Sequence, residues 1–223
     1  MIIAVSLVLV LLLVSLGTYI YTEVTYNKFK KIKIKSNLSG FEVSRNILDN
    51  YDLNNVYITE TSEYLFSRYD SDRKVIRLVK DVFNAENLTS TGISSIEAGY
   101  AVLDKKNNKM YSFRKKIVPF VNLLLFASYI IILIGIIFGH INTLLSGIII
   151  DYLILFFYIA TYSIDKEAEK IATEELIKNK IITKKELINV QKILKVTTFN
   201  NIVSIIFPIV ELIKKIVEFG KSN

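Results

Sequence analysis

The sequence predicts a membrane-bound, mostly α-helical protein that carries one small α+β domain. Two observations lead to this fold class. The chain of 223 residues is 52% hydrophobic and has a mean hydropathy of +0.40, which is more apolar than an ordinary soluble domain. Long uncharged stretches flank the only sizeable polar region, residues 36–117. A region of roughly 80 residues buries only a modest core, so we expect it to depend on the neighbouring helices.

The N-terminal stretch, residues 2–21, contains no charged side chain and reaches the length of about 20 residues that a bilayer requires. A signal peptide would start with a positive charge, whereas this stretch starts uncharged and is long. We therefore predict a transmembrane anchor over residues 1–21. The lysine-rich run 28–35 that follows is typical of residues that hold a span against the cytoplasmic face, and it also permits a short interfacial segment.

The polar region shows a helix followed by strands and a second helix. Ser39, with Glu42 three residues later, predicts a capping box and a helix that ends near residue 50. The β-branched and aromatic stretches 56–59, 65–66 and 75–78 predict strands, and the Asp- and Ser-rich stretch 69–73 predicts the turn between the last two. A helix is expected from about residue 91 to about residue 103.

A basic cluster at 105–116 precedes two uncharged or nearly uncharged stretches, 118–139 and 144–162, which are joined by a short connection. We predict a transmembrane helical hairpin over residues 118–162. Its one acidic residue is Asp151. Carboxylates inside a membrane are costly and often functional, but near the end of a span a carboxylate can also reach water or tyrosine side chains.

The rest of the chain predicts a charged helical tail over residues 163–195 and a further apolar helix in residues 196–223. Thr183 and Glu186 have the spacing of a second capping box. The apolar stretch 199–213 is interrupted by Pro208 and Glu211, so it is either a fourth transmembrane helix or a helix in the interface. The chain therefore has five predicted segments: the anchor 1–21, the α+β domain 22–117, the hairpin 118–162, the charged tail 163–195 and the last helix in 196–223.

The composition excludes several functions. There is no cysteine and only one histidine, His140, so a zinc site built from Cys and His ligands is excluded, and any metal site would be mostly carboxylate. A triad of Ser, His and Asp would have to use His140, which the predicted topology places across the membrane from the polar region. The net charge of +7 comes largely from lysines beside apolar stretches, which indicates anionic lipid and cytoplasmic loops rather than nucleic acid.

Several stretches resemble one known family in their order and spacing. They are 39–49 (SGFEVSRNILD), 69–78 (YDSDRKVIRL), 81–83 (DVF) and 114–122 (RKKIVPFVN). The chain is similar over nearly its whole length to the bacterial membrane-bound neutral zinc metallopeptidases of the YugP type. The resemblance implies an N-terminal anchor, a small α/β region ending in a His-Glu-x-Gly-His helix, a membrane hairpin and a charged helical tail.

The departures from this family fall on the residues that would bind and use the metal. In a zincin helix two histidines bind zinc and the glutamate beside the first is the general base. By this resemblance Glu97 occupies the general-base position, whereas Ile96 and Tyr100 occupy the two histidine positions. A further acidic ligand of the family falls near Ser163 by spacing, with Asp165 close by. The sequence therefore predicts a degenerate motif and no metal site.

Three functions follow as hypotheses, one of which is a purely structural membrane protein. The first is an integral membrane pseudopeptidase, a non-catalytic binding or regulatory protein that needs no zinc, in which Glu97 is a scaffold carboxylate. The alternative is an active membrane metalloendopeptidase with an unrecognised metal site. The expected partners are the lipid bilayer and a membrane protein, for example an active family member, and no nucleic acid. We expect a multi-pass protein of the cell membrane with its main polar domain in the cytoplasm.

Overall fold

The computed structural model describes residues 2–61 and 67–203, which form two compact units. Among the described residues, one unit consists of 2–20, 117–160 and 200–203, and the other of 21–61, 67–116 and 161–199. The second unit therefore unites the described part of the polar region, up to residue 116, with the whole charged tail, residues 163–195. The predicted five-segment division itself stays a prediction, and the predicted strand at 65–66 and most of the apolar stretch 199–213 lie outside the described residues.

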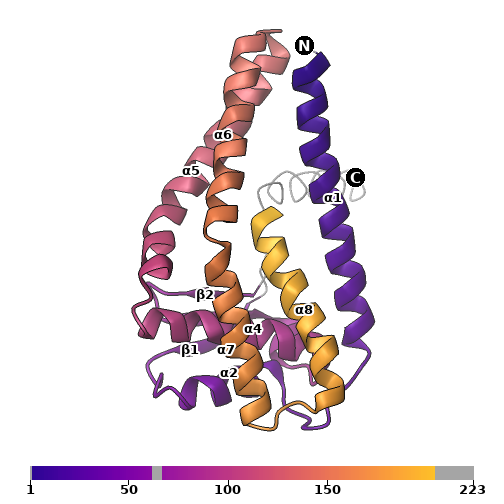
Figure 1. The fold of residues 1–223 in the computed structure, drawn as a ribbon, viewed down its shortest axis with the longest axis vertical. Coiled ribbons are helices and arrows are strands. Elements are labelled where there is room, and N and C mark those ends of the chain that lie inside the picture. Colours follow the sequence, from indigo (N-terminus) through magenta and orange to yellow (C-terminus); the bar gives the residue numbers. More distant parts are fainter. Residues whose placement is uncertain (1, 62–66, 204–223) are drawn as a thin grey trace, which may run out of the picture. The chain divides into compact units, whose positions relative to one another are not determined.

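The second unit contains a small sheet covered by helices (Figure 1). Its strands are β1 (Tyr57–Thr61), β2 (Arg68–Asp70) and β3 (Val75–Val79) in the spatial order β1-β3-β2. The pair β1–β3 is parallel and the pair β2–β3 is antiparallel, so β2 is an edge strand. The sequence predicted a turn over 69–73, but residues 68–70 pair with β3 and the turn follows them. Pairing with a neighbour, rather than propensity, makes this short segment a strand.

Polar side chains cap the beginnings of several helices of this unit. The helix α2 (Gly40–Asp49) starts with the predicted capping box, in which Ser39 and Glu42 bond to each other's backbone N–H groups. The predicted box of Thr183 and Glu186 is also confirmed, because the Thr183 N–H donates to Glu186 at 2.7 Å and the Glu186 N–H donates to Thr183 Oγ1 at 3.3 Å, just before α8 (Lys184–Val203). A short helix that the sequence did not indicate, α3 (Lys80–Phe83), follows β3.

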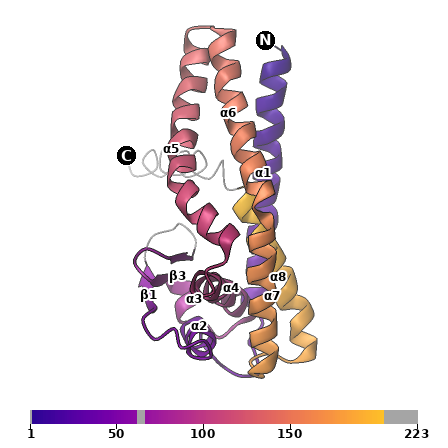
Figure 2. The same cartoon turned by 60° about the vertical axis from the view of Figure 1, so that its left-hand side comes forward.

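The central helix of this unit is α4 (Leu88–Lys105), which lies between the sheet and the helices α7 (Tyr162–Lys178) and α8 (Figure 2). It begins earlier than the predicted residue 91 because the Asn87 side chain accepts the Ser90 N–H at 2.9 Å and caps it. Every residue of α4 from Leu88 to Leu103 is buried. The core around it is apolar and includes Val43, Ile47, Leu48, Ile76, Leu78, Ile96, Ile164, Leu176, Ile193 and Leu194.

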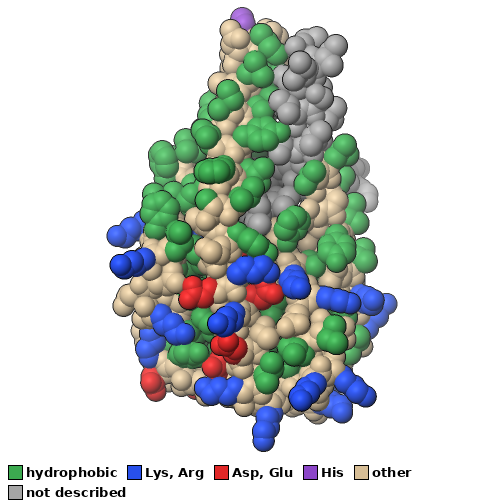
Figure 3. Space-filling model, viewed as in Figure 1, with side chains coloured by type: hydrophobic (Ala, Val, Ile, Leu, Met, Phe, Trp, Pro, Cys, Tyr) green, Lys and Arg blue, Asp and Glu red, His purple; other side chains and the backbone are tan. Residues whose placement is uncertain are grey.

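The first unit contains a helical hairpin formed by α6 (Ile141–Ala160) and the part of α5 (Lys109–Ile137) that follows residue 116. The stretches Lys109–Ile137 and Ile141–Lys178 are long and apolar enough to cross a membrane by length and composition. Large apolar side chains cover the surface of this hairpin (Figure 3), among them Phe120, Leu123, Phe126, Leu133, Ile136, Ile149, Leu153 and Phe156. The helix α1 (Ile2–Lys30) belongs to both units and continues through part of the lysine-rich run at 28–35.

Candidate functional site

The helix α4 is packed closely because two of its positions have no side chain. A Cβ atom on Gly99 would lie 2.7 Å from the backbone oxygen of Ala168 on α7, and one on Gly92 would lie 2.6 Å from Ile193 on α8. Both distances are shorter than real contacts, so glycine is what allows these helices to approach α4. The buried hydroxyl groups of α4 donate to backbone carbonyls, for example Ser95 to Gly92 at 3.0 Å, which satisfies them without water.

Glu97 projects from this helix to the sheet. Its side chain is buried, with the whole residue only 6% exposed, and its Oε2 atom accepts the backbone N–H of Tyr69 at 2.7 Å. Burial raises the pKa of Glu97 from its ordinary value of 4.5 to about 8. The hydrogen bond from Tyr69 lowers this pKa, the charge of Asp165 raises it and the charge of Arg68 lowers it. The folded protein therefore favours the neutral carboxylic acid at neutral pH.

We expect the stability of the protein to depend on pH through Glu97. Because its folded pKa lies above its unfolded pKa, the folded state holds a proton that the unfolded state releases between pH 4.5 and about 8. Relative to a Glu97→Gln variant, the wild type should lose unfolding free energy as pH rises through that window, by about 1.4 kcal/mol for each pH unit. Chemical denaturation of both proteins from pH 4.5 to 9 measures this difference, and parallel curves would contradict it.

Tyr100 lies one helical turn beyond Ile96 and takes part in a buried charged cluster. Its hydroxyl group donates to Asp165 Oδ1 at 2.5 Å, and Arg114 Nη1 lies 2.8 Å from the same oxygen. The side chains of Arg114 and Asp165 are 13% and 1% exposed. Burial, followed by the charge of Asp165, raises the pKa of the Tyr100 hydroxyl, so Tyr100 stays a neutral donor. The cluster joins α4, α7 and the start of α5 within one unit.

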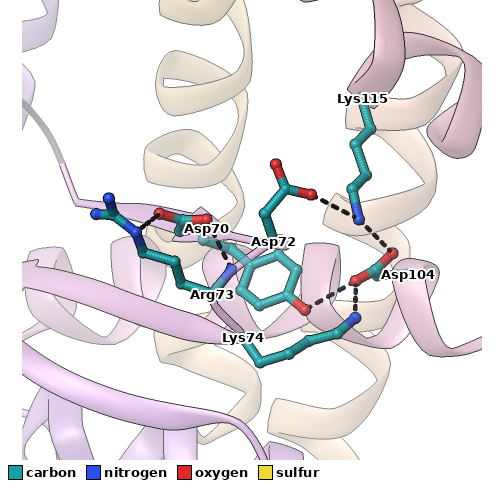
Figure 4. Close-up of polar contacts among 7 residues, drawn as sticks. Asp70, Asp72, Arg73, Lys74, Asp104 and Lys115 are labelled. Atoms are coloured by element: carbon teal, nitrogen blue, oxygen red, sulfur yellow. Dashed lines mark hydrogen bonds and ion pairs between the residues drawn. The ribbon is translucent and has the colours of Figure 1, made fainter.

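A second cluster holds the edge strand against α4 (Figure 4). The hydroxyl group of Tyr69 donates to Asp104 Oδ2 at 2.9 Å, and Lys74 Nζ lies 2.5 Å from the same oxygen. Lys115 contacts the other Asp104 oxygen at 3.8 Å and Asp72 at 3.2 Å. Tyr69 is therefore bonded to α4 twice, through its backbone to Glu97 and through its side chain to Asp104. These two bonds fix the position of β2 relative to α4.

The residues that the sequence singled out are only partly brought together. Ile96 is fully buried in the apolar core beside Glu97. Of the two positions left for an acidic ligand, Ser163 is exposed and Asp165 contacts Tyr100. Sequence reasoning missed Arg114, because it was counted with the lysines of a membrane-anchoring cluster. The sequence did contain one signal: Arg114 is the one arginine in a cluster with five lysines at 105–116. Arginine is the cation that suits buried ion pairs.

The side chains at this site do not fit a zinc ion. Zinc takes Cys, His and carboxylate ligands, and the described residues contain no group of three or more His, Cys, Asp or Glu side chains that could hold a metal. Ile96 has no donor atom, the hydroxyl of Tyr100 gives its proton to Asp165, and Asp165 is already paired with Arg114. The single histidine, His140, lies between α5 and α6 in the other unit.

Comparison with known proteins gives two matches. A family model described as "Putative neutral zinc metallopeptidase" matches residues 4–220. The chain is also similar to the "Putative membrane protease YugP" of Bacillus subtilis (strain 168), with 25% identity over 194 residues that cover 87% of this chain and 86% of the relative. No solved structure matches.

Proposed function

Because this chain belongs to the neutral zinc metallopeptidase family, we propose that it is a membrane-embedded member of that family without peptidase activity, which binds or regulates another membrane protein. The observation that carries the proposal is the pair of side chains that flank Glu97. Both Ile96 and Tyr100 are buried, and neither offers a free metal-binding atom. In this proposal they replace the two histidines of a degenerate zincin motif, and Glu97 keeps the position of the general base without a metal to act on.

The surroundings of Glu97 support a structural role for this residue. A general base has to reach a water molecule, whereas the Oε2 atom of Glu97 is held by the N–H of Tyr69. Since β2 is an edge strand of the sheet, this N–H is also a group that an extended peptide could use to add a strand. Glu97 therefore blocks one hydrogen-bonding position at that edge. Both features favour a site that is closed by the protein's own side chains.

The acidic position of the family supports the same conclusion whichever residue fills it. Ser163, the position that spacing indicates, carries no carboxylate and is exposed. Asp165 carries a carboxylate, but Arg114 neutralises it and Tyr100 donates to it. A carboxylate with these partners would have to give up an ion pair in order to bind a metal.

We expect purified protein to contain no stoichiometric zinc and to be indifferent to chelators. Metal content is measured on protein extracted in mild detergent, with peptidase activity followed before and after chelation, and thermal unfolding recorded alongside. If Glu97 has only a scaffold role, neither zinc nor a chelator should change the unfolding temperature of the protein. Stoichiometric zinc that a chelator removes together with peptidase activity would contradict the proposal and favour an active metalloendopeptidase.

Restoring the two histidines tests how much of the site has been lost. We expect the double substitution Ile96→His and Tyr100→His to create weak zinc binding at best, because the third ligand and the residues that orient the ligands are also absent. Isothermal titration with zinc measures the affinity. The single substitution Tyr100→His is the matched control, since it removes the Asp165 contact without completing the pair. Peptidase activity from the double substitution alone would show that a third ligand is present after all.

We propose a membrane topology with the N-terminus outside, residues 22–117 inside, the turn between α5 and α6 outside, and residues 163–195 inside. Lysines that flank both ends of residues 22–117 support it. The chain has no cysteine, so a thiol reagent can label only a cysteine that is introduced by substitution. In intact cells a cysteine at Lys109 should resist a membrane-impermeant thiol reagent, and one at Asn142 should react. Both positions are exposed. The reverse pattern would invert the topology.

A further inference from the structure

The two helices of the hairpin touch along a narrow interface with small residues at its closest points. A Cβ atom on Gly135 of α5 would lie 2.6 Å from the backbone nitrogen of Leu144 on α6. One on Gly147 of α6 would lie 2.6 Å from the Ile132 side chain and 3.0 Å from the Ser128 backbone oxygen. Such small residues let helices approach closely, as in helix pairs within membranes. Farther along the same interface, Leu125 and Ile154 are buried in one apolar cluster.

Asp151 lies in this interface and bonds across it. The residue is 8% exposed, and its Oδ1 atom lies 2.5 Å from the hydroxyl oxygen of Ser128, which is fully buried on α5. The same hydroxyl group lies 2.8 Å from the backbone oxygen of Leu125. The neighbouring hydroxyl of Tyr129 is buried and makes no hydrogen bond within the described part of the chain. Ser128 therefore connects a carbonyl oxygen of its own helix with a carboxyl oxygen of the other helix.

Ser128 cannot donate to both of these oxygen atoms. A serine hydroxyl has one proton, and a backbone carbonyl can only accept. If Ser128 donates to Leu125, the usual bond of a serine inside a helix, the bond to Asp151 needs a proton from the carboxyl group. We propose that Asp151 is a neutral carboxylic acid that closes the α5–α6 hairpin by donating its proton to Ser128.

The charges of the hairpin support a neutral acid. No Lys or Arg occurs in residues 117–160, and the one histidine, His140, lies in the turn between α5 and α6, so neither helix of the hairpin carries a cation that could balance an ionised Asp151. The other described parts of this unit, residues 2–20 and 200–203, contain no Lys or Arg either. An unpaired carboxylate in an apolar interface is costly, whereas a protonated one keeps both a donor and an acceptor. The inference rests on the proposed membrane location of the hairpin, because water would remove that cost.

A hydrophobic carbodiimide tests the protonation state directly. The carboxylic acid adds to the reagent, its proton passes to a nitrogen and its oxygen bonds to the central carbon, and the acyl group then migrates to nitrogen as a stable adduct. Full-length protein in lipid vesicles at pH 7 is treated with dicyclohexylcarbodiimide, digested and examined by mass spectrometry. We expect an adduct on Asp151 and none in an Asp151→Asn variant. Asp72, which is exposed, should instead react with a water-soluble carbodiimide and an added amine.

The substitution pattern tests the donor role. Asp151→Asn should keep the hairpin stable, because an amide N–H can donate to Ser128, whereas Asp151→Leu and Ser128→Ala should lower the thermal unfolding temperature in vesicles. Modification of Asp151 by the water-soluble reagent but not the hydrophobic one would overturn the proposal and indicate an ionised group open to water or a partner. The cysteine labelling described above distinguishes the two failures. Equal labelling at both positions rejects the membrane location of the hairpin. Protection at one of the two positions, without the adduct on Asp151, rejects the neutral acid.

Discussion

Replacing Arg114 with Met should destabilise the protein by about 3–5 kcal/mol, the range expected when one partner of a buried ion pair is removed. Asp165 would keep its charge in a position where its side chain is only 1% exposed, and the Tyr100 hydroxyl would still donate to it. The free energy of unfolding in urea, measured in detergent micelles, gives the size of the effect. Methionine is the replacement because it nearly fills the space of the arginine stem.

The chain offers a matched control in the exposed pair of Lys170 and Glu174, whose side chains are 73% and 61% exposed. Lys170→Met should change the stability by less than about 0.5 kcal/mol, because exposed pairs one helical turn apart contribute little. Adding Asp165→Leu to Arg114→Met should recover part of the loss, since it removes the unpaired charge. Equal and small effects of Arg114→Met and Lys170→Met would show that the Arg114–Asp165 pair does not form.

The second large effect is expected from Gly99→Val. A side chain at this position would meet the backbone of Ala168, which cannot move without shifting α7 away from α4. Overpacking of this kind costs about 1–3 kcal/mol, and here the backbone contact places it at or above the upper end. The same shift should weaken the bond between Tyr100 and Asp165. Thermal unfolding in detergent, with tyrosine near-ultraviolet circular dichroism as a local probe, would report both changes.

Gly17→Val on α1 controls for the effect of replacing glycine by valine in a helix without a packing clash, because a Cβ atom on Gly17 meets nothing within 4 Å. Both substitutions exchange glycine for valine inside a helix, where valine is slightly favoured. Gly17→Val should therefore be neutral or slightly stabilising. If Gly99→Val proved as stable as Gly17→Val, the close contact between α4 and α7 would be refuted.

Local signals in the sequence were enough to place much of the fold. The two capping boxes, Ser39 with Glu42 and Thr183 with Glu186, were predicted because both partners lie within one helical turn. The hairpin of α5 and α6 was predicted from the length and the apolar composition of its two stretches. The strand β2 was not, because its three residues become a strand only through pairing with β3. The short helix α3 likewise gave no pattern long enough to recognise.

By itself the sequence determined the absence of cysteine, the single histidine, and the presence of Ile96 and Tyr100 on either side of Glu97. These facts already excluded a conventional zinc site. Only the tertiary structure decided which groups meet at this position. The chain has 28 basic residues, and sequence spacing does not say that Arg114 pairs with Asp165, 51 positions away, or that the Tyr69 N–H binds Glu97. A cap depends on neighbours within one turn, whereas a buried ion pair depends on how separate helices pack, which is settled by the whole core.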